Sequence, residues 1–105
     1  MTSVHDIREL LAAPMPSDAR LLLEQLDETL TAGYAAALQL EAERWRIERR
    51  IGEVAAAVGQ ERDDGRVDEL GALARSLTEA NAQISVLRTL LSSLRDRRKA
   101  LRKAA

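Results

Sequence analysis

Apolar residues recur along most of this chain at intervals that alternate between three and four positions. One such stripe runs from Leu23 to Val58, and a second runs from Leu70 to Leu101. This alternation places every member on one face of an α-helix, which is the pattern of helices that pack along an extended seam. The stripes therefore predict two long helices. Their members, called seam residues below, are Leu23, Leu26, Leu30, Gly33, Ala37, Leu40, Arg44, Ile47, Ile51, Val54 and Val58, followed by Leu70, Leu73, Leu77, Ala80, Ile84, Leu87, Leu91, Leu94, Arg98 and Leu101.

A polar segment with the sequence GQERDDG, residues 59–65, separates the two stripes. A glycine-bounded polar segment of this length joins antiparallel helices. We therefore predict a long antiparallel helical hairpin over residues 17–105, resembling a coiled coil. Its helices are expected over residues 17–58 and 66–103.

Matching the two stripes end to end predicts the register of the hairpin. Gly33 then faces Leu91 and Arg44 faces Ala80, so that a small residue meets a large one in both layers. A charged residue in an apolar seam costs stability and often determines register or oligomeric state. Alternatively, the Arg44 side chain extends outward to a glutamate one turn away on the same helix.

A shorter amphipathic helix is predicted ahead of the hairpin, within residues 1–13. Ser3 can cap its first turn, and its apolar residues fall on one helical face. Pro14 and Pro16 make residues 14–16 a stiff connector, because each proline bars its predecessor from the α region. The short helix is expected either to cap the end of the helical bundle or to dock on a partner.

Large aromatic side chains are almost absent, since the 105 residues include one Trp, one Tyr and no Phe. Such a chain cannot easily fill a wide globular core at native packing density, whereas helices lying side by side need no large side chains. Together with the stripes, this composition predicts an all-α fold.

The sequence shows no sign of a membrane or secreted protein. No apolar run approaches the ~20 residues that span a bilayer, and the N-terminus has no signal-peptide pattern. Without cysteine, the chain has neither disulfides nor thiolate metal sites. We expect a cytoplasmic protein that does not bind membranes.

Charge is distributed unevenly, although the net charge is only −1. Residues 1–41 contain seven acidic and two basic residues, whereas residues 80–105 contain seven basic residues and one acidic residue. An antiparallel hairpin brings these segments together and places Arg98 within reach of Asp27. Opposite charges beside a seam determine helix orientation and register more than stability. The matching flanks carry Asp27, Glu41 and Glu48 on the first long helix and Arg88, Arg95 and Arg102 on the second.

Residues for catalysis are scarce. The chain has one His, no Cys and one Tyr, and a two-helix hairpin offers no enclosed pocket to activate a base or nucleophile. It lacks the Glu-x-x-His pairs of a di-metal bundle, and GQERDDG lacks the lysine of a phosphate-binding loop. We therefore expect no enzymatic activity, no catalytic residue, no cofactor and no metal site, with His5 as a surface residue.

Basic residues at the end of the second long helix are one candidate binding surface, because they could contact nucleic-acid phosphates. The isoelectric point of about 5.9 and the lack of aromatic residues for base stacking disfavour this interpretation. A regulator that binds nucleic acid or nucleotides is therefore kept as an alternative function. The residues are Arg95, Arg97, Arg98, Lys99, Arg102 and Lys103.

Apolar residues beside the seam are the other candidate surface. Two helices cannot cover both edges of the seam, and exposed apolar patches with aromatic anchors mark association sites. We expect these residues to form the core of a homodimeric four-helix bundle, or to bind a helical protein partner or client. The predicted partner interface contains Leu22, Tyr34, Leu38, Trp45 and Leu90.

Two stretches, LEAER at residues 40–44 and RRKALRKAA at residues 97–105, resemble helical-hairpin flagellar export chaperones. The resemblance implies a small export or folding chaperone as an alternative function, and no residue role is transferred from it. The main prediction is a self-associating, non-enzymatic module for protein–protein interaction.

Overall fold

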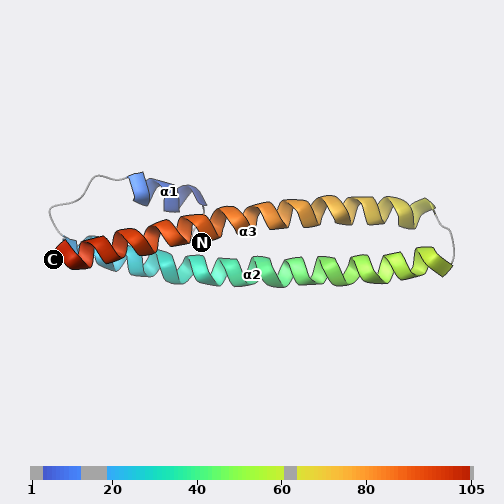
Figure 1. Ribbon diagram of the computed structural model, residues 1–105, viewed down its shortest axis with the longest axis horizontal. Coiled ribbons are helices and arrows are strands. Elements are labelled where there is room, and N and C mark those ends of the chain that lie inside the picture. Colours follow the sequence, from blue (N-terminus) through green and yellow to red (C-terminus); the bar gives the residue numbers. More distant parts are fainter. Residues whose placement is uncertain (1–3, 13–18, 61–63, 105) are drawn as a thin grey trace. The chain divides into compact units, whose positions relative to one another are not determined.

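The computed structural model describes residues 4–12, 19–60 and 64–104, and all of them are helical. Helix α1 is Val4–Ala12, α2 is Ala19–Gln60 and α3 is Asp64–Ala104 (Figure 1). The predicted all-α fold with two long helices is confirmed. None of these three helices has a stretch both long and apolar enough to cross a bilayer.

Both long helices extend into the predicted loop at residues 59–65. Helix α2 continues through Gly59 and ends at Gln60, and α3 begins at Asp64. A glycine costs a helix only about 1 kcal/mol relative to alanine, and each added helical residue gains a hydrogen bond. Asp64 also lies in the first turn of α3, where the helix dipole favours an anion. Ser3 and the predicted connector at residues 14–16 lie outside the described residues.

The seam residues behave as the stripes predict. Each of them is buried or half-buried along both long helices. The structure therefore confirms which face of each long helix is turned inward.

The described chain divides into two compact units. The first, called the three-helix unit, contains α1, α2 up to Leu38 and α3 from Ser85 onward. The second, called the two-helix unit, comprises Gln39–Ile84 and so contains the remaining parts of α2 and α3. Within each unit α2 and α3 lie side by side and antiparallel, as the hairpin prediction requires (Figure 1).

Most of the core belongs to the three-helix unit. The predicted register holds there, because a Cβ atom added to Gly33 would meet the Leu91 side chain. Helix α1 contributes Ile7, whose side chain is fully buried; burial of such a side chain stabilises a fold by about 1.5–3 kcal/mol. The buried apolar residues of this unit are Ile7, Leu22, Leu26, Leu30, Ala37, Leu87, Leu91, Leu94 and Leu101.

The two-helix unit buries its seam less completely. Among its apolar residues only Val54, Ala80 and Ile84 are buried. Two helices cover each other along one line of contact, so the sides of that line stay open to solvent. The apolar seam residues left half-buried are Leu40, Ile47, Ile51, Val58, Leu70, Leu73 and Leu77.

Candidate interaction surfaces

One predicted interface edge is covered by the chain itself. Leu22 and Leu90 each directly precede a seam residue and belong to the three-helix unit. Leu22 is only 3% exposed and Leu90 is half-buried. The structure therefore places Leu22 in the core of the three-helix unit, which also contains α1.

Arg97 connects α1 to the hairpin. Its guanidinium donates a hydrogen bond to the backbone carbonyl oxygen of Leu11, one residue before the end of α1. The last carbonyls of a helix have no partner within the helix, and the helix dipole makes them negative. A cationic donor from α3 therefore satisfies a carbonyl at the C-terminal end of α1.

Arg98 also makes a contact within the three-helix unit. Its Nε atom pairs with Oδ1 of Asp27 in α2, which confirms the predicted proximity of these residues. Two of the six basic residues considered for nucleic acid thus serve contacts within the three-helix unit. Exposed side chains remain at four positions, which are Arg95, Lys99, Arg102 and Lys103.

Arg44 reaches out of the seam in the two-helix unit. Its half-buried side chain approaches the Glu48 carboxylate at 3.7 Å and donates a hydrogen bond to Oδ1 of Asn81 at 3.5 Å. Ala80, which the predicted register places opposite Arg44, is buried directly before Asn81. The small alanine leaves room for the arginine stem to pass and carry its charge outward.

The other predicted edge is exposed. In the three-helix unit, Tyr34 and Leu38 are 41% and 67% exposed, and they lie one turn apart on α2. In the two-helix unit, Trp45 is 58% exposed, with the Arg49 guanidinium 5.3 Å from the centre of its ring. A cation at this distance is attracted by the ring face. The structure thus leaves three of the five predicted interface residues accessible.

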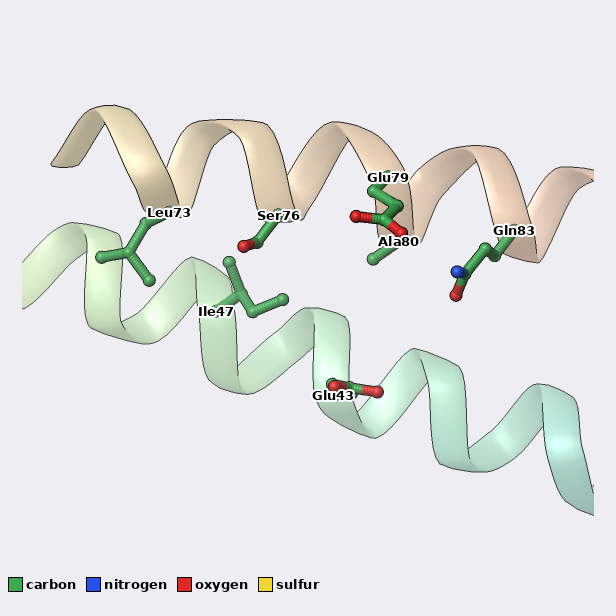
Figure 2. A pocket seen from close by; sticks show the side chains of 7 residues that line it. All are labelled: Glu43, Ile47, Leu73, Ser76, Glu79, Ala80 and Gln83. Carbon is green, nitrogen blue, oxygen red and sulfur yellow. The ribbon is translucent and has the colours of Figure 1, made fainter. Parts of the chain in front are cut away.

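A groove lies along one side of the two-helix unit (Figure 2). The Ile47 and Leu73 side chains extend into the space between α2 and α3, and Ala80 lies further along α3. Two carboxylates, those of Glu43 and Glu79, also line the groove. Neither has an ion-pair partner among the described residues. The remaining lining residues are Ser76 and Gln83.

Sequence reasoning identified Ile47, Leu73 and Ala80 as seam residues but did not identify this groove. The sequence offered a partial signal, because each polar residue that lines the groove directly precedes a seam residue. These residues are Glu43, Ser76, Glu79 and Gln83.

An ion-pair cluster lies near the end of the two-helix unit. The Arg50 guanidinium contacts Glu69 of α3 at 2.8 Å and Glu53 of α2 at 3.4 Å. The hydrogen bond and negative charge of Glu69, followed by the hydrogen bond to Glu53, raise the pKa of Arg50 above its ordinary value. This cluster links the two helices with opposite charges.

The described residues contain no group of three His, Asp or Glu side chains placed to hold a metal ion. The fold and surfaces define an all-α class of protein, a helical hairpin with a short third helix. No protein family model, curated protein or solved structure matches the chain.

Proposed function

We propose that this protein is a non-enzymatic interaction module that self-associates through helical packing. The observations that support the proposal are the exposure of Leu38 in the three-helix unit and the exposure of Trp45 in the two-helix unit. These residues are seven positions apart and so occupy the same position of the three-four repeat. A second copy that covered them would remove two of the largest exposed apolar side chains from water.

The chemistry of these residues suits a protein interface. Tryptophan, tyrosine and arginine are enriched among residues that dominate binding energies, and Tyr34, Trp45 and Arg49 are all exposed on α2. The Arg49 guanidinium beside Trp45 gives the apolar surface a cationic border. Pairing of two hairpins into a four-helix bundle is the assembly that we propose.

Light-scattering mass at low and high micromolar concentrations tests this function. We expect the mass to rise toward that of a dimer at the higher concentration. The variant Leu38→Ala/Trp45→Ala should shift the monomer–dimer transition to at least tenfold higher concentration. This shift corresponds to a loss of about 1.4 kcal/mol in the free energy of association.

The matched control is Val67→Ala/Val86→Ala. This pair also removes exposed apolar side chains, and it should leave the transition unchanged. A wild-type mass that stays monomeric at both concentrations would refute self-association. An equal effect of both double variants would instead exclude Leu38 and Trp45 as the specific contacts.

A further inference from the structure

We infer that the groove of the two-helix unit binds a basic amphipathic helix from another protein. The groove combines apolar side chains with two carboxylates that have no ion-pair partner among the described residues (Figure 2). This inference does not depend on self-association, because the groove lies within the two-helix unit of one copy.

The apolar lining explains why the occupant is a helix. Ile47 and Leu73 are seam residues that stay half-buried, because α2 and α3 alone cannot enclose them. The groove follows α3 from Leu73 to Gln83, which is roughly 15 Å at the rise of an α-helix. An amphipathic helix of about three turns has the right length to cover this distance with apolar residues at every third and fourth position.

The chain itself provides a precedent in the three-helix unit. There a nine-residue amphipathic helix, α1, packs with the α2 and α3 segments and buries Ile7. The hairpin residues that directly precede the seam include Leu22, Leu90 and Arg97, and Arg97 binds the end of α1. This hairpin is thus able to accept a short helix beside its seam.

Charge indicates that the groove's partner is basic. Two acidic side chains, Glu43 and Glu79, line the groove beside its apolar residues. Two copies pairing groove to groove would bring like charges together, which costs binding energy. A helix with Lys or Arg beside its apolar face neutralises both carboxylates.

Fluorescence anisotropy with two labelled peptides tests the inference on the full-length protein. The peptides have about 18 residues, so that they can form stable helices on binding. Both carry the same leucine face, and one has lysine where the other has glutamate. We expect the lysine peptide to bind at least about tenfold more tightly than the glutamate peptide, and the difference to shrink at high salt.

Charge reversal locates the site. The variant Glu43→Lys/Glu79→Lys should reverse the preference, so that the glutamate peptide binds more tightly. The control Glu24→Lys/Asp68→Lys makes the same change in net charge at exposed positions outside the groove, and it should keep the preference for the lysine peptide.

Three outcomes would overturn the inference. These are failure of the lysine peptide to bind, a preference that persists in Glu43→Lys/Glu79→Lys, and an equal effect of both double variants. The last outcome would mean that the net charge of the protein, and not the groove, attracts the lysine peptide. Each result is independent of the mass measurement, so loss of the groove inference leaves self-association intact, and the reverse also holds.

Discussion

The Arg97 side chain of α3 donates a hydrogen bond to the backbone carbonyl of Leu11 in α1, joining residues 86 positions apart in the sequence. This contact, with the buried Ile7, turns part of a hairpin into a three-helix unit. A basic residue near the end of α3 therefore stabilises the three-helix unit, whether or not this end also binds a ligand.

Replacing Arg97 tests this role. Arg97→Ala removes a charged donor from the end of α1, and a hydrogen bond to a charged group contributes about 1.5–3 kcal/mol. We expect a loss of about 1–2 kcal/mol in the free energy of unfolding, measured by urea denaturation. Hydrogen exchange in Val4–Ala12 should also become faster. The exposed neighbour Arg95→Ala is the control, and equal exchange in both variants would contradict the assigned role.

The close approach of Gly33 to Leu91 predicts that two glycine substitutions change the stability of the protein in opposite directions. A methyl group at Gly33 would collide with the buried Leu91 side chain, whereas nothing lies within 4 Å of the same group at Gly52. We expect Gly33→Ala to destabilise the protein by about 1 kcal/mol, because overpacking offsets the gain in helix propensity. Gly52→Ala should stabilise it by about 0.5–1 kcal/mol.

Urea denaturation measures both changes, and a smaller side chain at position 91 provides a further check. Leu91→Ala creates space beside Gly33, so Gly33→Ala should cost less in that background than in the wild type. If Gly33→Ala proves as stabilising as Gly52→Ala, the two helices do not approach closely at this layer.

Arg44 is expected to lower stability at its position in the seam. Its stem lies in an apolar layer, while its charged end contacts the exposed side chains of Glu48 and Asn81. Arg44→Leu should raise the melting temperature and increase the free energy of unfolding by about 1 kcal/mol, because a leucine packs in the layer without desolvating a charge. It should also loosen oligomer specificity. Arg46→Leu, at an exposed position of the same helix, is the control in thermal denaturation, and a large loss of stability in Arg44→Leu would refute this interpretation.

The two units should differ in local stability. Segments with few buried apolar residues open at lower free energy than well-packed ones. Amides at residues 44–54 and 70–78 should therefore exchange about tenfold faster than those at residues 22–37 and 87–101, which corresponds to about 1.4 kcal/mol. Hydrogen exchange with mass spectrometry measures this contrast. Uniform protection along both long helices would show that the half-buried seam is as stable as the core.

The sequence by itself determined the long helices, their inward faces and, within the three-helix unit, their register. The three-four repeat is a local property of each helix, and it holds at every seam residue. The pairing of two long stripes leaves only one register in which Gly33 meets Leu91 and Asp27 lies near Arg98. Both contacts fit the register predicted from the stripes.

Only the tertiary structure decided the position of α1 and the distinction between the two units. A nine-residue amphipathic helix can pack on any apolar edge, and its periodicity does not say which. The choice depends on how Ile7 fits the core and on the Arg97 contact with Leu11, both of which involve residues distant in sequence. For the same reason, the sequence did not show that Leu22 would be buried or that the groove beside Ile47 and Leu73 would stay open.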